Sequence, residues 1–167
     1  MIVDKVEKKV DNNHNIIILS DRKTSKKYAP IPILLVCSYV HHGLIKRKKR
    51  SKFGIVIESA EPREPHHFSM LFGYGASAIN PYMVNEIIEY HHKLGFLNEQ
   101  KLDKSIDNFN KAIAKGILKV MNKIGISTLH SYRGAQIFEA LGLRKKFVNK
   151  YFNCLLYTSP SPRDHQP

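Results

Sequence analysis

FGIVIESAEPREPHHFSMLFGYGASAINPY, at residues 53–82, carries the residue pattern on which the predicted fold rests. It opens with a short run rich in β-branched residues at 53–57, which is typical of a strand because it is too short for a buried helix. Apolar side chains at helical spacing follow over 66–74, and glycines end that helix. A second short apolar run, 76–79, stops at an Asn-Pro pair, since proline cannot donate to a strand ladder. A strand, a helix and a strand within about 30 residues predict a βαβ unit.

A further strand and helix precede this unit. The apolar run at 16–19 predicts a strand, and the broad apolar stripe over 33–45 predicts a helix packed against a sheet. Residues 1–15 are polar, and we expect them to fray. The crossovers are too long for hairpins, which indicates parallel strands with right-handed connections. The predicted fold class is therefore α/β: a parallel βαβαβ unit, barrel-like or an open sheet, followed by a helical region from about 83 to 142.

The helical region contains helix-period stripes that each stop at a glycine. The predicted helices span 84–94, 109–124 and 132–141, and they are followed by Gly95, Gly125 and Gly142. A polar link at 98–100 follows the first helix, and Ser131 is expected to cap the last one. We expect the last two helices to lie against the βαβ core, with three aromatic side chains packed behind them: Phe147, Tyr151 and Phe152.

Composition and charge limit the class of protein. The chain of 167 residues has 27 Lys and Arg against 14 Asp and Glu, and its formal charge of +13 is compatible with a nucleic-acid or other anionic partner. The basic residues scatter along the chain apart from a dense run at 46–52. We interpret this run as a solvated loop, because no aromatic residues interleave with it for base stacking. Nucleic-acid binding and contact with an acidic neighbouring surface are the alternatives.

Targeting and redox signals point to a cytoplasmic protein. No apolar run reaches the roughly 18 residues of a membrane span, and the N-terminal residues lack the apolar core of an export signal. Cys37 and Cys154 have no paired spacing, which favours reduced thiols over a disulfide frame or a metal site. We therefore expect no membrane partner.

Polar residues follow every predicted strand. The carboxyl ends of parallel strands share one edge, where α/β proteins bind ligands. The residues expected at this edge are Ser20, Asp21, Glu58, Ser59 and Asn80.

The densest polar cluster begins at the same edge. It comprises Glu58, Glu61, Arg63, Glu64, His66 and His67. One interpretation pairs Glu58 with His66 or His67 as acid and base. The favoured interpretation is structural: Arg63 pairs with a carboxylate, and the histidines cap the start of the helix that follows.

Other candidate sites also favour structural roles. The histidine pairs at 41–42 and 91–92 are adjacent in sequence, which favours surface or packed histidines over the one-turn spacing of helical metal ligands. The glycines of GYG at 73–75 follow a helix instead of preceding one, so they predict a turn and not a phosphate cradle. Arg133 and Gly134 predict either contact with a neighbouring domain or a close packing approach.

Four segments carry a family resemblance. They are LSDR at 19–22 with APIP at 29–32, ESAEPREPHHF at 58–68, GYGASAINPY at 73–82 and KGILKVMNKIGISTLHSYRGAQIFEALGL at 115–143. Together they resemble the large chain of glutamate synthase, in the second half of its central domain. The resemblance covers nearly everything from Ile16 to Phe152. It implies a partial central domain at 1–153.

The resemblance implies a large cytosolic enzyme that makes two glutamates from glutamine and 2-oxoglutarate. Ammonia released at an N-terminal cysteine would travel through a tunnel to an iminoglutarate intermediate, with electrons from FMN and a three-iron, four-sulfur cluster. The partners implied are the glutaminase and FMN-binding domains of the same chain, and a small electron-donating subunit or ferredoxin. The sequence has no N-terminal cysteine, cysteine cluster or flavin phosphate loop, so we expect no catalytic, cofactor-binding or metal residues, and no activity of this fragment alone.

The end of the chain departs from the resemblance. Residues 154–167 include LLYTSPSPRD at 155–164, which looks like a translated adapter or vector scar; a native Ser-Pro tail is the alternative. We expect no packed contacts after about Asn153.

Two functions therefore remain open at this point. The first is a central-domain fragment that mechanically holds two active sites in register through the helices at 109–124 and 131–141. The second is a small stand-alone basic module that binds nucleic acid or an acidic protein. The first predicts scattered basic residues and an uncovered apolar sheet edge or helix face, whereas the second predicts a continuous basic face. We favour the first and expect no nucleic-acid partner.

Overall fold

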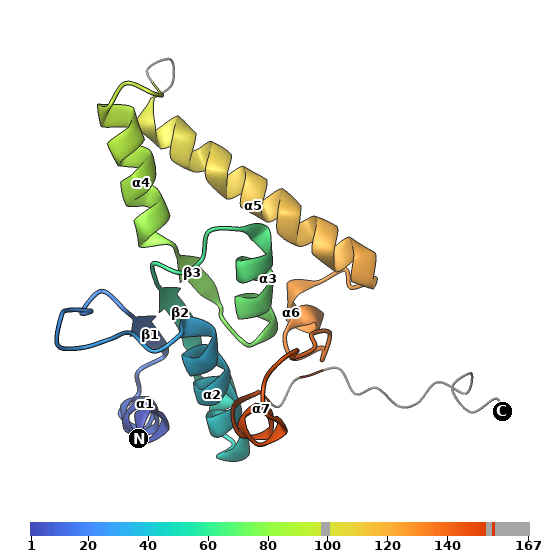
Figure 1. The fold of residues 1–167 in the computed structure, drawn as a ribbon. Coiled ribbons are helices and arrows are strands. Elements are labelled where there is room, and N and C mark those ends of the chain that lie inside the picture. The colour runs from blue at the N-terminus through green and yellow to red at the C-terminus, as the bar shows by residue number, and fades with distance from the viewer. Residues whose placement is uncertain (98–100, 153–154, 156–167) are drawn as a thin grey trace.

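A parallel sheet forms the centre of the computed structural model, which describes residues 1–97, 101–152 and 155. Its three strands are β1 (Ile16–Ser20), β2 (Gly54–Glu58) and β3 (Ala78–Asn80), in the order β1-β2-β3 (Figure 1). The register places Ile17 beside Ile55 and Ile57 beside Ile79. The parallel βαβαβ prediction is confirmed, with each strand beginning within two residues of its predicted start. In the described part of the chain the sheet is open, which decides between the two predicted forms.

Two crossover helices, α2 (Ile33–Lys46) and α3 (Pro65–Gly73), connect consecutive strands as predicted. The first residue of α3 is a proline, which suits this position because the N–H it lacks has no partner inside the helix. The buried face of α2 packs on β1 and β2, where it contributes Val36, Cys37, Val40 and Leu44 to the core. Since these side chains meet Ile55 and Ile57 of the central strand, the core lies between α2 and the sheet.

The N-terminal segment is helical, so the expectation that residues 1–15 fray is wrong. Helix α1 (Ile2–Asp11) buries Val3, Val6 and Val10. Spacings of three and four residues put these valines on one face, which packs against α2. A helix needs only one apolar stripe to dock, and its charged residues occupy the rest of the surface. High local charge therefore did not exclude a packed helix here.

Helices α4 (Tyr82–Lys93) and α5 (Leu102–Ile124) form an arm that leads away from the sheet and back (Figure 1). Both were predicted, although α5 begins at Leu102 and not at residue 109. Gly125 ends α5 in the left-handed conformation, with φ 76°. The arm rests on α3 where Gly116 faces Pro65, and a Cβ on this glycine would come within 2.5 Å of the proline ring. The predicted polar link at 98–100 lies outside the described residues.

The predicted helix 132–141 is not formed. Instead α6 (Leu129–Tyr132) is a single turn, and its cap is Thr128, whose hydroxyl accepts from the Ser131 N–H at 3.3 Å. Gly134 then turns with φ 74°, and its N–H donates to the Gly73 carbonyl at 2.9 Å. This long-range bond ends the helix, and Phe138 stacks on Tyr74 with ring centroids 6.0 Å apart. Tertiary packing has overridden the local helical pattern.

The last helix, α7 (Lys145–Tyr151), packs on α2 and not behind a helix pair. The Ser38 hydroxyl donates to the Tyr151 carbonyl at 2.5 Å, and the Tyr151 ring meets Tyr39 edge-on. Phe152 contacts Tyr74 in the same way. Of the tail after Asn153, only Leu155 is described, and it forms an isolated bridge with Phe138. The expectation of an unpacked tail fails at that residue and otherwise lies outside the described range.

Candidate functional site at the carboxyl edge of the sheet

The polar residues after the three strands lie together, as predicted. The Asp21 N–H donates to the Glu58 carbonyl at 3.2 Å, and the Ser59 N–H donates to the Asn80 carbonyl at 3.1 Å. Since these bonds continue the sheet ladder, they carry the side chains of all three strand ends to one edge. This edge is the candidate functional site.

Asp21 is held by hydrogen bonds from the neighbouring strand end. Its Oδ2 accepts from the Ser59 hydroxyl at 2.6 Å and from the Ala60 N–H at 3.1 Å. Partial burial by itself raises the pKa of Asp21, but donation from Ser59, Tyr82 and Ala60 outweighs it and lowers this pKa below its usual range. The same contact with Asp21 raises the pKa of the Tyr82 hydroxyl to about 12. The aspartate is therefore ionised and the tyrosine neutral at neutral pH.

Glu58 is held in a similar way from β1. Its carboxylate accepts from the Ser20 hydroxyl at 2.6 Å and from Arg22 Nε at 2.9 Å. Donation by Ser20, and then by Arg22, lowers the pKa of Glu58. Arg22 also reaches Glu86 of α4 at 3.3 Å and lies 4.0 Å from the centre of the Tyr82 ring. The guanidinium thus joins the two strands to the arm.

We call this arrangement the carboxylate latch. Its members are Ser20, Asp21, Arg22, Glu58, Ser59, Tyr82 and Glu86. A general base works best when its pKa lies near the operating pH. The pKa values of Asp21 and Glu58 are both lowered, and each carboxylate already accepts two hydrogen bonds. The geometry therefore suits a joint between β1, β2 and α4 better than acid–base chemistry. The prediction that this segment contains no catalytic residue stays a prediction.

The histidines proposed as partners of Glu58 are engaged elsewhere. His67 Nδ1 accepts at 3.2 Å from the N–H of Arg63, a residue that precedes α3. The start of α3 has no side-chain cap, so the predicted capping role of the histidines is wrong. His66 meets the Phe138 ring edge-on. Within the described residues the Arg63 side chain makes no ion pair, so its predicted carboxylate partner is wrong.

Glu61 has a role that the sequence did not suggest. Both of its carboxylate oxygens lie 3.1 Å from the Ile33 N–H and cap the start of α2. Pro32 supplies no side-chain cap of its own at this helix start. A helix preceded by proline and lacking Ser, Thr, Asp or Asn is the signal that indicates such a distant cap.

His41 and His42 of α2 are buried, so of the two predicted environments, the surface or the packed interior, they occupy the packed one. Arg50 Nε donates to His41 Nδ1 at 2.8 Å, while the same guanidinium donates to the carbonyls of Phe53 and Gly75. Burial, and then the Arg50 charge, lowers the pKa of His41 to about 3, and burial lowers that of His42 to about 4. Both rings are thus neutral at neutral pH. Gly75 takes φ 101°, which bears out the predicted turn.

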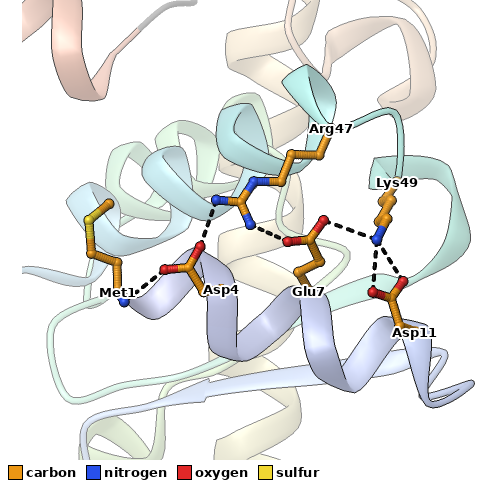
Figure 2. A network of polar contacts seen from close by, with 6 residues as sticks. All are labelled: Met1, Asp4, Glu7, Asp11, Arg47 and Lys49. Atoms are coloured by element: carbon orange, nitrogen blue, oxygen red, sulfur yellow. Dashed lines mark hydrogen bonds and ion pairs between the residues drawn. The ribbon is translucent and has the colours of Figure 1, made fainter.

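The basic run at 46–52 is not a fully solvated loop, so that interpretation is wrong for three of its members: Arg50, which donates to His41, and Arg47 and Lys49, which form ion pairs. Arg47 pairs with Asp4 at 2.7 Å and with Glu7, and Lys49 pairs with Glu7 at 3.0 Å and Asp11 at 2.7 Å (Figure 2). The acidic residues of α1 are thus the acidic neighbouring surface that was the alternative. Neutralisation inside the chain interrupts the continuous basic face that a stand-alone nucleic-acid module would need.

Exposed apolar side chains occur at several places on the described surface, and two groups of them lie on the arm and on the edge strand. On the arm, the exposed side chains include Ile87, Tyr90, Leu94, Phe96 and Leu118. On the edge strand β1, Ile16 and Ile18 are exposed. Such surfaces typically mark contacts with another protein surface.

Within the described ranges, no group of three or more His, Cys, Asp or Glu side chains is placed to hold a metal ion. The described helices also include none with the length and apolarity that a membrane crossing requires.

Comparison with known proteins gives consistent matches. Residues 1–144 match the family described as the glutamate synthase central domain. The chain is 42% identical to the large chain of the glutamate synthase [NADPH] of Bacillus subtilis, over 89% of this chain and 10% of that protein. It is 43% identical to the glutamate synthase [NADH] of Schizosaccharomyces pombe, over 90% of this chain and 7% of that protein. It is 40% identical to the ferredoxin-dependent glutamate synthase of Pyropia yezoensis, over 84% of this chain and 10% of that protein. The chain thus spans about a tenth of the length of these relatives.

Proposed function

Since this chain belongs to the glutamate synthase central domain family, we propose that it is part of a glutamate synthase large chain and works there as a scaffold between catalytic domains. The observation that carries the proposal is the match over residues 1–144 by a chain about a tenth as long as its relatives. The substrates proposed for the whole enzyme are glutamine and 2-oxoglutarate, which it converts to two glutamates in ammonia assimilation. Its location would be cytoplasmic.

The chemistry is proposed to reside outside these residues. By family resemblance, FMN and a three-iron, four-sulfur cluster would carry the electrons, supplied by a small subunit or by ferredoxin. The residues described here do not fit such a cluster, because they contain no group of ligating side chains that could hold a metal ion. The part of this chain would be to hold the glutaminase and FMN-binding domains in a fixed relation, so that ammonia released at one site reaches the other.

The arm is the element best suited to that task. It joins the sheet through the carboxylate latch at α4, and it rests on α3 through the contact between Gly116 and Pro65. The C-terminal part of α5 carries Leu118, which is 61% exposed. A helical arm that is attached to the core at two points and exposes apolar side chains can fix the position of a neighbouring domain relative to the core. The sequence predicts a pair of helices at 109–124 and 131–141 in this role. The arm takes the place of that pair here, because the second predicted helix is not formed.

Leu118→Asp in the full-length enzyme tests the proposal. Because the side chain is exposed in this chain, the substitution should leave the fold of the segment intact but disrupt an apolar domain contact. We expect the ratio of glutamate formed to glutamine hydrolysed to fall below that of the unmodified enzyme. Asn110→Asp is the matched control, since it adds the same charge to an exposed position of α5 without removing apolar surface. An unchanged ratio in Leu118→Asp would remove the arm from the proposed scaffold.

A further inference from the structure

Strand β1 has a free edge. It pairs with β2 alone, and the ladder begins with the Gly54 N–H donating to the Asn15 carbonyl at 2.8 Å and ends with Asp21 donating to Glu58. In a parallel ladder, alternate residues of one strand bond the same neighbour. The odd-numbered residues of β1 therefore face β2, and the main-chain groups of Ile16, Ile18 and Ser20 point to the side where the described part of the chain places no strand.

A groove runs along this free edge. It has a volume of about 560 Å³ and lies between β1, α1 and the loop that follows β1. Val6, Ile33 and Val36 line its inner side. Four large apolar side chains that line the groove are exposed to solvent, with relative accessibilities of 64% for Ile16, 61% for Ile18, 63% for Tyr28 and 57% for Ile31. A segment bound there would meet apolar surface on both of its faces.

The strand itself carries no charge, proline or bulge that would protect a free edge. Edge strands of monomeric proteins are typically interrupted by lysine, proline or a bulge, since an uncharged edge invites pairing with another chain. The sequence of β1 is IIILS, which contains no charge and no proline. An edge of this kind is normal when another strand covers it.

The rim of the groove is basic. Lys5, Lys9, His14 and Lys23 line it, and the one acidic residue in the lining, Asp21, is already held by the carboxylate latch. Two copies of this chain paired through β1 would bring two basic rims together, which is unfavourable. A segment with carboxylates near its ends is the complementary occupant.

We propose that β1 receives a further strand from another part of the full-length polypeptide, apolar along both faces and flanked by acidic residues. The added strand would pair with the main chain of Ile16, Ile18 and Ser20 and fill the groove. This inference rests on the proposed function, because the relatives' greater length, about tenfold, supplies the polypeptide from which the strand comes. Addition of a strand to an exposed sheet edge is a recurrent recognition mode in which main-chain hydrogen bonds provide much of the affinity.

Amide hydrogen exchange tests the inference directly, because it reports main-chain hydrogen bonds residue by residue. In the 167-residue chain, the amides of Ile17 and Leu19 should exchange slowly, and those of Ile18 and Ser20 should exchange fast. In the full-length enzyme, we expect Ile18 and Ser20 to slow by at least roughly tenfold, while Ile17 and Leu19 stay protected. Fast exchange of Ile18 and Ser20 in both proteins would overturn the inference.

Two further measurements separate the alternatives. If the 167-residue chain sediments as a dimer and already protects Ile18, the edge binds a second copy and the inference is wrong. Ile18→Asp should lower the melting temperature of the full-length enzyme more than that of the 167-residue chain, and Asn110→Asp should affect both equally little. The coupling ratio of Leu118→Asp tests the scaffold separately, so failure of the strand addition and failure of the proposed function give different results.

Discussion

Gly75→Ala is predicted to be among the most damaging single-methyl additions to this chain. Gly75 takes φ 101°, a conformation that side-chain-bearing residues rarely adopt. A Cβ at this position would lie 2.0 Å from Nδ1 of His41. The imidazole has little room to retreat, because it is buried and accepts the hydrogen bond from Arg50.

The magnitude follows from two costs. The left-handed backbone conformation costs about 1–2 kcal/mol for a residue with a Cβ. Displacing His41 breaks its hydrogen bond to the charged Arg50, and bonds to charged groups contribute roughly 1.5–3 kcal/mol. The free energy of unfolding should therefore fall by about 2.5–5 kcal/mol, a large part of the roughly 5–15 kcal/mol of a typical domain.

Denaturant unfolding of the 167-residue chain, followed by circular dichroism, measures this loss. Gly125→Ala is the matched control, because Gly125 also has a positive φ of 76° but a Cβ there would meet nothing within 4 Å. The control should lose only the backbone cost of about 1–2 kcal/mol. If Gly75→Ala is no more destabilising than Gly125→Ala, the argument from the His41 contact is refuted.

The remaining predictions concern acid stability and domain coupling. Hydrogen bonds from the N-terminal amino group and from Arg47 lower the pKa of Asp4 to about 2. The stability that this carboxylate contributes is complete above its unfolded pKa of about 3.9 and is lost as the pH falls towards 2. In denaturant titrations over this pH window, the free energy of unfolding of Arg47→Ala should therefore decrease less steeply with falling pH than that of the unmodified chain. Equal pH profiles of the two proteins would contradict the ion pair. Arg133→Ala should lower the ratio of glutamate formed to glutamine hydrolysed in the full-length enzyme, because the side chain is only partly buried and forms no ion pair within the described residues, which leaves its charge available to a neighbouring domain. Lys48→Ala, at an exposed position, should leave that ratio unchanged, and an equal ratio in both variants would count against a domain contact at Arg133.

The alternation of strands and crossover helices along the chain, from β1 to β3, could be predicted from local residue patterns. The runs at β1 and β2 are β-branched and short, and the stripe of α5 keeps the helical period until Gly125. These signals are local, since each depends on residues a few positions apart. The polar residues after the strands were also predictable, because parallel strands must bring their carboxyl ends to one edge.

The pairing of distant residues became visible only in the folded chain. Glu58 meets Arg22 and not a nearby histidine, and Arg47 and Lys49 meet the acidic face of α1 some 40 positions away. The region after Tyr132 kept a helical pattern yet turned at Gly134, because a hydrogen bond to Gly73 and the packing of Phe138 stabilise the turn more than one further helical turn would. Pairings of this kind depend on which surfaces the folded chain brings together, and the local spacing of residues carries no record of them.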